Sequence, residues 1–381
     1  MSAEKNQEQG RHDQYREEVA GRANVEDTPE LIAYYKDLER LETAALWTVA
    51  NKIEPWEPKS ASVPVLWRYR DLREHVLRSV ELVSPEKAGR RVIYLNNPGR
   101  KDDAAAVGWL YSGLQVMHPG EVASAHAHSA SALRFIMEGT GAYTIVDGHK
   151  MTLGANDFVL TPNGTWHEHG VEASGSPCIW QDGLDIPLVN VLEANFYVVH
   201  PDLQQAVGYA VDDMSKTWGN PGLRPSTGDW SKGYSPLLKY EWAPTYEALT
   251  RFAQTTEGSP FDGVMMNYVN PVTGGPVMQT IGASMQMLRP GERTKAHRHT
   301  GSFIYQVAKG SGFSIIGGRR FDWQERDIFC VPSWAWHEHA NGSDKDDACL
   351  FAFHDLPVMQ ALGLYREEAF LDNRGYQPSV N

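Results

Sequence analysis

The sequence predicts an all-β protein of two jelly-roll barrels with a helical N-terminal extension. From about Arg90 onward, short runs of β-branched and aromatic residues alternate with glycine. The pair Asp147-Gly148 is a typical hairpin turn between two such runs. The same pattern of short apolar runs separated by glycine recurs over 277–353. Many short strands of even spacing are typical of a sandwich or a jelly-roll barrel, and the recurrence indicates that the barrel is present twice.

The N-terminal extension is predicted to be largely helical. A polar arm over 1–26 precedes Thr28-Pro29, a pair typical of a helix N-cap and first turn. The apolar residues that follow recur every three or four positions, which predicts an amphipathic helix with one buried face. A proline-containing extended connector over 52–65 and a second helix over 69–83 complete this part.

We expect five segments along the chain. The stretch between the two barrels is irregular and rich in glycine, proline and tryptophan, with one predicted helix after Pro244. A short helix over 356–368 is expected after the second barrel. The predicted boundaries are 1–90 for the arm and helices, 91–200 for the N-terminal barrel with a metal site, 201–274 for a linker, 275–355 for the C-terminal barrel, and 356–381 for the C-terminal helix and tail.

Composition excludes several classes of partner. A net charge of −13 over 381 residues argues against nucleic acid and against an anionic membrane surface. The N-terminus is polar, and no apolar run is long enough to span a bilayer, so we expect a cytoplasmic protein. Cys178, Cys330 and Cys349 have no CxxC spacing and are expected to be buried free thiols in a reducing compartment.

Histidines supply the clearest chemical signal, because eight of the 14 lie in two matched windows. The windows are offset by 171 residues at one position (297−126) and by 170 at another (337−167), which indicates a duplicated domain. Residues i and i+2 of a strand face the same side, so His126 and His128 both face inward. His167 on a later strand can complete a triad, and histidine is the commonest metal ligand. The matching residues of the second copy are His297, His299 and His337.

Arg134 distinguishes the two copies. It lies eight residues after His126, an even offset that lets it face the same cavity, and arginine beside a metal can bind a carboxylate bidentately. A surface salt bridge is a second possible role for this residue. Tyr305 stands at the corresponding position of the second copy. We therefore expect the first copy to be the working site and the second to be vestigial, with its metal binding left open.

Both windows resemble the two motifs of the cupin superfamily. The first motif is a glycine, five residues and then HxH, here Gly120 with His126 and His128. The second is PxGxxH, here Pro162 to His167. The second copy matches except that Trp334 replaces the glycine of the second motif. Two copies make a bicupin, and the resemblance covers about 100–200 and 275–355.

One departure from the cupin pattern concerns the ligand set. Many cupins carry a glutamate ligand shortly after HxH, whereas Ala132-Leu133 and Phe303-Ile304 stand there in this chain. Three neutral imidazoles would leave a divalent ion its full charge and open positions for a chelating anion and O2. This argues against an oxalate-decarboxylase type of bicupin.

Three segments are similar to gentisate 1,2-dioxygenases and to their relatives acting on salicylate, substituted salicylates and 1-hydroxy-2-naphthoate. They are 126–135, 166–169 and 182–187. The resemblance implies Fe(II) held by His126, His128 and His167, a homo-oligomer that is usually a tetramer, and an extradiol-type reaction. In that reaction O2 opens the ring of a small aromatic hydroxy acid between the carboxyl-bearing and the ortho-hydroxyl-bearing carbons.

The same resemblance implies roles for further residues. Arg134 matches the carboxylate-binding arginine, and either Arg90 or Arg91 matches a second arginine that helps to hold the substrate. Gln115 and His169 match residues on the hydroxyl side of the substrate, where His169 can help to remove the phenol proton. Asp182 matches an acidic residue near the site. Purely structural roles stay open for three of them: a strand polar group for Gln115, a rim residue for His169 and a loop cap for Asp182.

The substrate is left open by the sequence. Gly113 lies two residues before Gln115 and can face the same cavity; gentisate-selective relatives often carry a larger residue there, which indicates a roomier pocket. Tyr111 has the same parity and can contact the ring. Gentisate and a broader salicylate-type specificity stay equally open. The sequence is also compatible with 1-hydroxy-2-naphthoate cleavage, with a metal-dependent decarboxylase or isomerase, and with a ligand-storing bicupin.

Overall fold

The computed structural model describes residues 25–227 and 229–378. It divides into two compact units, one ending at Lys59 and the other running from Ser60 to the C-terminus. The polar arm predicted over 1–26 lies almost entirely outside the described residues.

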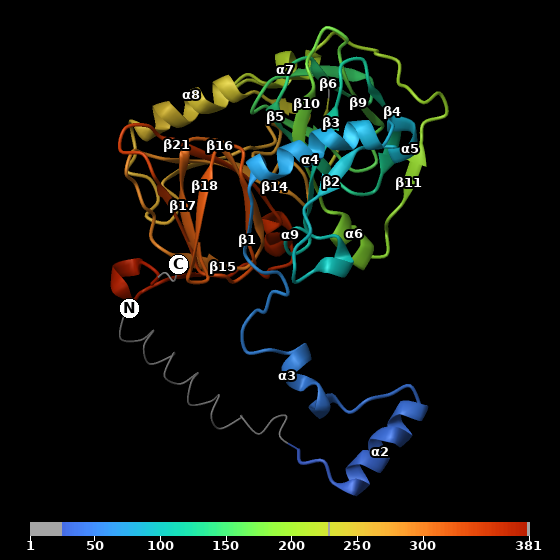
Figure 1. Cartoon of the computed structure of the whole chain (residues 1–381), viewed down its shortest axis with the longest axis vertical. Coiled ribbons are helices and arrows are strands. Elements are labelled where there is room, and N and C mark those ends of the chain that lie inside the picture. The colour runs from blue at the N-terminus through green and yellow to red at the C-terminus, as the bar shows by residue number, and fades with distance from the viewer. Residues whose placement is uncertain (1–24, 228, 379–381) are drawn as a thin grey trace. The chain divides into compact units, whose positions relative to one another are not determined.

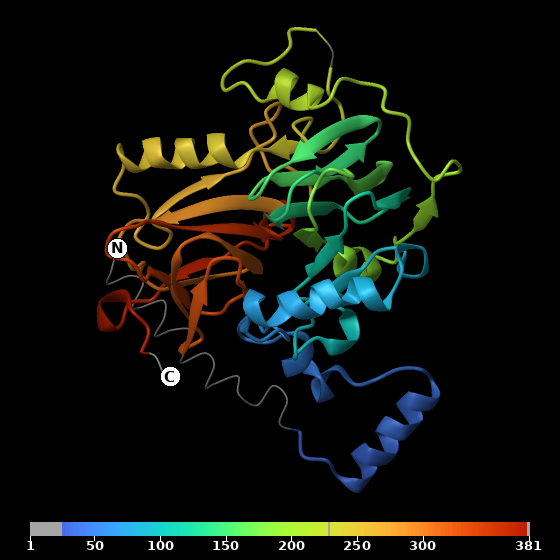
Figure 2. The same cartoon turned by 45° about the horizontal axis from the view of Figure 1, so that its top comes forward.

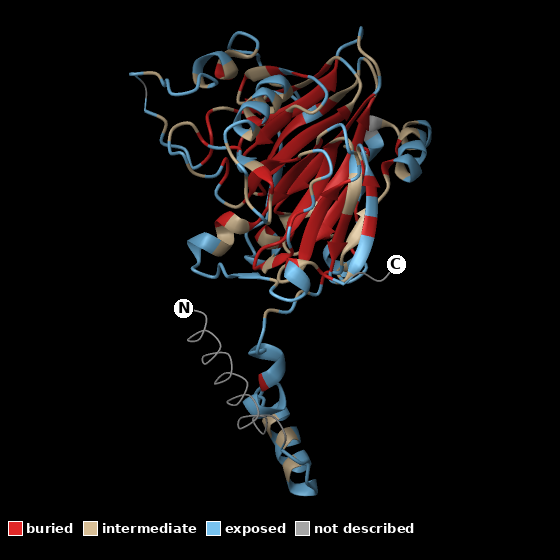
Figure 3. Cartoon of the chain, turned by 90° about the vertical axis from the view of Figure 1, so that its left-hand side faces the viewer, coloured by how far each residue is buried: buried red, intermediate tan, exposed pale blue. Residues whose placement is uncertain are grey.

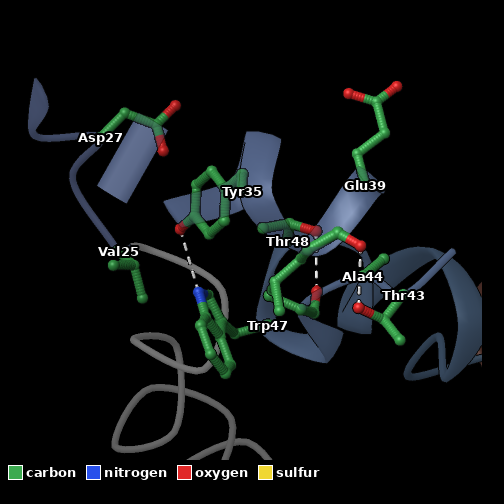
Figure 4. Close-up of a pocket in the computed structure, with 10 residues that line it drawn as sticks. Val25, Asp27, Tyr35, Glu39, Thr43, Ala44, Trp47 and Thr48 are labelled. Atoms are coloured by element: carbon green, nitrogen blue, oxygen red, sulfur yellow. Dashed lines mark hydrogen bonds between the residues drawn. The ribbon is translucent and has the colours of Figure 1, made fainter. Parts of the chain in front are cut away.

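The first unit contains α2 (Pro29–Arg40), η2 (Leu46–Thr48) and α3 (Ala50–Ile53). Thr28 caps α2 as predicted, because its hydroxyl accepts the Leu31 N–H at 3.2 Å. The predicted buried face is not seen, since no α2 residue is buried within the described part of the chain. Instead α2 and η2 line an open pocket, where Trp47 Nε1 donates to the Tyr35 hydroxyl at 3.0 Å (Figure 4).

The N-terminal barrel is formed by two antiparallel sheets with the strand orders β12-β8-β5-β10-β3-β2 and β11-β4-β9-β6-β7 (Figure 1). Hairpins such as β6–β7 alternate with crossovers between the sheets, as in a jelly roll. Its strands are β2 (Val92–Tyr94), β3 (Tyr111–Met117), β4 (Val122–His128), β5 (Ala132–Glu138), β6 (Ala142–Val146), β7 (His149–Leu153), β8 (Phe158–Thr161), β9 (His167–Val171), β10 (Cys178–Leu184), β11 (Tyr197–Val199) and β12 (Lys239–Tyr240).

The C-terminal barrel repeats this plan, with the orders β1-β19-β16-β21-β14-β13 and β18-β17-β20-β15-β22. The predicted all-β class and the duplication are thereby confirmed. Its strands are β1 (Val65–Trp67), β13 (Val264–Asn267), β14 (Gly282–Leu288), β15 (His297–His299), β16 (Phe303–Lys309), β17 (Ser311–Ile316), β18 (Arg319–Gln324), β19 (Ile328–Val331), β20 (His337–Asn341), β21 (Ala348–His354) and β22 (Glu367–Ala369).

Short helices lie on the surface of the second unit. The predicted helices over 69–83 and after Pro244 are confirmed as α4 and α8. The helix predicted over 356–368 is shorter, because the chain after α9 turns into strand β22. The helical elements are α4 (Tyr69–Leu82), α5 (Pro85–Ala88), η3 (Lys101–Asp103), α6 (Ile186–Val191), α7 (Asp213–Trp218), α8 (Trp242–Ala253), α9 (Leu356–Ala361) and η4 (Asn373–Gly375).

Segments outside the expected barrel boundaries complete both barrels. Strand β1 pairs with β19, so the N-terminal extension adds an edge to the C-terminal barrel. Within 201–274, β12 pairs with β8 of the first barrel and β13 pairs with β14 of the second. These strands are two to four residues long. Such short strands carry little periodic signal in a sequence.

The two barrels lie side by side (Figure 2), and aromatic side chains from both pack between them. The rings of Phe135 on β5 and Phe351 on β21 stack with centroids 4.0 Å apart, and Phe158 on β8 lies 5.2 Å from Phe351. A Cβ on Gly183 would lie 2.6 Å from Phe353, so glycine permits this close approach. Figure 3 shows that the strands carry most of the buried residues.

All three cysteines are buried and free, as predicted. Among the described residues, no helix combines the length and the apolar character that crossing a membrane requires.

Candidate metal centre and substrate pocket

The first-copy histidines meet inside the N-terminal barrel. His126 and His128 lie at the end of β4, and His167 opens β9, where it pairs directly with His126. The ring centroids are 4.2 Å apart for His126 and His167, 4.7 Å for His128 and His167, and 5.6 Å for His126 and His128. All three side chains are buried. The strands thus bring together the triad that the spacing predicted.

Backbone carbonyls orient these three rings. The Nδ1 atoms of His126, His128 and His167 lie 2.7, 2.8 and 3.0 Å from the carbonyl oxygens of Ser124, Ala130 and Thr165. Since a carbonyl only accepts, each Nδ1 carries the proton and each Nε2 presents a lone pair. The three Nε2 atoms are buried and have no partner among the described residues. Buried acceptors without donors fit a cation.

Burial also keeps the triad in the protonation state that a metal needs. It lowers the pKa of His126 to about 3 and that of His128 to about 4, with the charge of Arg90 adding to both effects. The pKa of His167 is also well below its ordinary value, chiefly through burial. Metal ligation requires neutral imidazole, so the site is preorganised for a divalent ion.

His169 lies beside the triad and is a second candidate for the third metal ligand. One ligand nitrogen each from His126, His167 and His169 lie within 4.8 Å of one another. His169 Nε2, however, accepts a hydrogen bond from Arg134 Nη2 at 2.6 Å, and its Nδ1 contacts the Thr144 hydroxyl at 3.2 Å. Both ring nitrogens of His169 therefore have hydrogen-bond partners, whereas Nε2 of His128 has none among the described residues. The hydrogen bonds favour His128 as the third ligand.

Arg134 lies in the barrel interior and is only 2% exposed. This position excludes the surface salt bridge considered from the sequence. Its Nε is 3.2 Å from Asp182 Oδ1 on the neighbouring strand β10, and its Nη1 donates to the Thr161 hydroxyl at 3.2 Å. Burial lowers the pKa of Arg134 to about 10, so it remains a cation at neutral pH. Asp182 is a strand residue that holds this cation, not a loop cap.

The structure separates the two adjacent arginines. Arg90 is half-buried, its charge lowers the pKa values of His126 and His128, and its Cζ lies 5.7 Å from the ring centroid of Tyr197. The Arg91 side chain is 4% exposed and forms an ion pair with Glu121. Arg90 therefore lies close to the triad, whereas Arg91 is held in an ion pair with Glu121.

Tyr197 is a site residue that the sequence analysis missed. It lies on β11, which pairs with β4 so that Tyr197 is opposite His128. Its ring stacks on His126 with centroids 5.3 Å apart and planes 24° apart, and 54% of the residue is exposed. No motif surrounds this tyrosine. Only the pairing of a three-residue strand brings it to the metal centre.

The residues of β3 have different surroundings. Gln115 is buried, and its Oε1 has no partner in the described structure. The Tyr111 ring stacks on Tyr94 at 6.1 Å. A Cβ on Gly113 would lie 2.5 Å from Val92 Cγ1, so strand β2 occupies the space where the sequence indicated a roomier pocket. Glycine at this position permits the close approach of β2.

A duplicated jelly roll with a buried histidine triad and an internal arginine defines a metal-dependent bicupin. The cupin domain family matches residues 113–187 and 284–354. The chain is 38% identical to 5-aminosalicylate 1,2-dioxygenase from Comamonas sp over 90% of this chain and 91% of that protein. It is 37% identical to gentisate 1,2 dioxygenase 1 from Aquipseudomonas alcaligenes over 89% and 96% of the two chains.

A structural comparison agrees with these relatives. The salicylate 1,2-dioxygenase from Pseudoaminobacter salicylatoxidans, solved as adducts with gentisate, has a TM-score of 0.83 at 33% identity. The match covers 91% of this chain and 95% of that chain. The chain belongs to the gentisate and salicylate 1,2-dioxygenase family of ring-cleaving bicupin enzymes, as the sequence motifs indicated.

Proposed function

We propose that this protein is an Fe(II)-dependent dioxygenase that opens a hydroxybenzoate, such as gentisate or a salicylate, between its carboxyl-bearing and ortho-hydroxyl-bearing carbons. The observation that carries this proposal is the set of three buried, unpartnered Nε2 atoms beside the internal Arg134. Relatives named for 5-aminosalicylate and gentisate support the substrate class. When bound, ferrous iron supplies the redox chemistry by which O2 attacks an aromatic ring.

Charge around the triad favours an anionic substrate. Three neutral imidazoles leave the positive charge of a divalent ion uncompensated, and Arg90 and Arg134 add two cations in a protein with a net charge of −13. A guanidinium presents a planar fork of N–H donors that matches a carboxylate. We assign Arg134 to the substrate carboxylate, and Asp182 to positioning Arg134.

His169 is suited to accept the phenol proton. Thr144 fixes its Nδ1, while Nε2 presents a lone pair that Arg134 now occupies. Once the substrate carboxylate takes donors of Arg134, this lone pair is released beside the substrate. Burial, followed by the charge of Arg134, holds the pKa of His169 well below its usual range, so the ring is neutral before the substrate binds. Because the substrate carboxylate offsets the charge of Arg134, its binding favours proton uptake by His169. Gln115 Oε1 supplies an acceptor for a substrate hydroxyl.

The two adjacent arginines give a matched test of the pocket. Arg90→Ala is expected to raise KM for the substrate by about 10-fold, because one partly solvated charge interaction is lost. Arg91→Ala is expected to leave KM unchanged and to lower the unfolding midpoint, because Glu121 loses its partner. Steady-state kinetics and thermal unfolding of both variants show which arginine binds the substrate and which one stabilises the fold. A KM effect confined to Arg91→Ala would exchange the two assignments.

We also propose that the enzyme is a homo-oligomer, and a tetramer in particular. The support is a set of exposed apolar side chains on and around α6 and β11, beside the metal centre. A molar mass from light scattering that matches one chain would contradict the homo-oligomer, and a mass of two or three chains would contradict the tetramer. The residues are Val191, Leu192, Phe196, Tyr197, Val198 and Val199.

The activity is tested by oxygen uptake after anaerobic loading with Fe(II). The substrates are gentisate, salicylate, 5-aminosalicylate and 1-hydroxy-2-naphthoate. We expect oxygen consumption with at least one of them and a ring-opened product in equal amount. Product formation without oxygen consumption would favour a decarboxylase or isomerase, and no consumption with any substrate would refute the dioxygenase.

A further inference from the structure

We propose that the C-terminal barrel contains a second metal site, with a structural role. It binds a divalent transition-metal ion through His297, His299, His337 and the carboxylate of Asp262. This goes beyond the ring-cleaving function, which lies in the first barrel, and differs from the vestigial role expected from the sequence. No catalytic step is assigned to this ion. The proposal rests on geometry, on the orientation of the rings and on the charges around them.

The second triad keeps the geometry of the first. Its ring centroids are 5.4 Å apart for His297 and His299, 4.4 Å for His297 and His337, and 4.9 Å for His299 and His337. Each value is within 0.2 Å of the matching distance in the first barrel. One ligand nitrogen from each of the three lie within 4.8 Å of one another. The strand register thus places three histidine nitrogens where a single ion can contact all of them.

Ring orientation in the second triad also suits a metal. His337 Nδ1 lies 2.9 Å from the Ala335 carbonyl oxygen, the same contact that His167 makes with Thr165. His299 Nδ1 lies 3.3 Å from the carbonyl oxygen of Thr300. These contacts place the proton on Nδ1 and leave Nε2 as the ligand atom.

His297 has a stronger partner than its counterpart in the first barrel. Its Nδ1 is 3.2 Å from Glu367 Oε1 on strand β22. A carboxylate that accepts from Nδ1–H fixes the tautomer and makes the opposite nitrogen a better metal ligand. Glu367 is opposite His299 in the strand register, the position that Tyr197 takes opposite His128. The position that carries an aromatic ring in the first barrel carries an anion in the second.

Asp262 provides the fourth ligand. Its Oδ1 lies 3.8 Å from His297 Nε2, while its Oδ2 accepts the Ser259 hydroxyl at 2.9 Å. Two ligand atoms each about 2.1 Å from a tetrahedral ion are about 3.4 Å apart. Oδ1 is thus within a few tenths of an ångström of the coordination spacing from His297. Asp262 is not among the ligand atoms that lie within 4.8 Å of one another, so coordination together with His299 and His337 takes a larger rotation of its side chain. Three imidazoles and one carboxylate would fill the four positions of a tetrahedral divalent ion and leave none open for a substrate.

The charges of the two sites are opposite. Asp262 stands two residues before β13, and Arg90 stands two residues before the corresponding strand β2. Tyr305 occupies the position of Arg134. The first site thus combines a cation with arginines and suits an anionic substrate, whereas the second supplies carboxylates and suits the cation alone. An ion there would join β15, β20 and the segment before β13, and through Glu367 would hold the edge strand β22.

The test uses the full-length protein loaded anaerobically with Zn²⁺ or Fe²⁺ and then dialysed, with metal content measured per chain. We expect two ions in the wild type, one in His128→Ala and one in His299→Ala, matching the two triads. In the His128→Ala protein, only the second site remains, so added Zn²⁺ should raise the unfolding midpoint. Adding Asp262→Asn to it should weaken Zn²⁺ binding by at least about 10-fold.

Several outcomes would overturn the proposal. One ion in the wild type, with none left in His128→Ala, would mean that the second triad binds no metal. Unchanged Zn²⁺ affinity after Asp262→Asn would remove Asp262 from the ligand set, and this variant is nearly isosteric, so it decides the matter even if His299→Ala fails to fold. None of these readouts depends on ring-cleaving activity. Failure of the second metal site can therefore be distinguished from failure of the proposed function.

Discussion

Replacing His128 with alanine is expected to remove the metal ion from the first barrel and to abolish ring cleavage. The imidazole provides one of three unpartnered Nε2 atoms, and two remaining ligands hold a divalent ion weakly. Loss of the several kcal/mol that a metal contributes to the transition state predicts a fall in kcat/KM of at least about 1000-fold. Oxygen uptake and metal content of the same preparation measure both effects.

A matched control lies on the same sheet of the barrel. His149 on β7 pairs with Asp213 at 2.9 Å and stacks on Tyr209, outside the metal centre. His149→Ala removes an imidazole of equal size and is expected to retain the metal and most of the activity. A His128→Ala protein that still consumed oxygen at the wild-type rate would place the catalytic ion elsewhere.

Replacing Arg134 is expected to separate substrate binding from metal binding. Arg134→Met should raise KM by about 10- to 100-fold, because charge-assisted hydrogen bonds to a carboxylate contribute about 1.5–3 kcal/mol. The metal should stay bound, since the guanidinium contacts His169, Thr161 and Asp182 and none of the three proposed ligands. Steady-state kinetics with saturating O2, together with metal content, measure the two properties separately.

The Arg134→Met substitution also leaves the Asp182 carboxylate buried without its cation, which costs about 3–5 kcal/mol of folding stability. The double variant Arg134→Met with Asp182→Asn removes both charges and is expected to recover most of the unfolding midpoint without recovering KM. If the double variant recovered KM as well, Arg134 would act through stability and would not bind the substrate.

Much of the first site could be predicted from the sequence because its residues follow local rules. The even spacing of His126 and His128 on a strand fixes a common face, and the same parity argument carries Arg134 to the interior. The structure places all three residues inside the barrel. The duplication offset likewise predicted a second barrel with a second triad.

What could not be predicted depends on pairings between distant segments. Tyr197 reaches His126 only because β11 pairs with β4, and Asp262 and Glu367 reach His297 through a loop and an edge strand. Strands of three residues carry almost no periodicity, so nothing local marks these side chains as neighbours of a metal. The choice between Arg90 and Arg91 also needed the structure, because a shift of one residue in the comparison with the family exchanges the two arginines.

We propose that the triad of the first barrel, and not that of the second, holds the catalytic iron. The most direct measurement is oxygen uptake with gentisate or salicylate as Fe(II) is titrated anaerobically into metal-free wild type and His128→Ala. Oxygen uptake is expected to rise with added iron in the wild type and to stay absent in the variant, even where the variant binds iron. Iron-dependent oxygen uptake by the His128→Ala protein would contradict it.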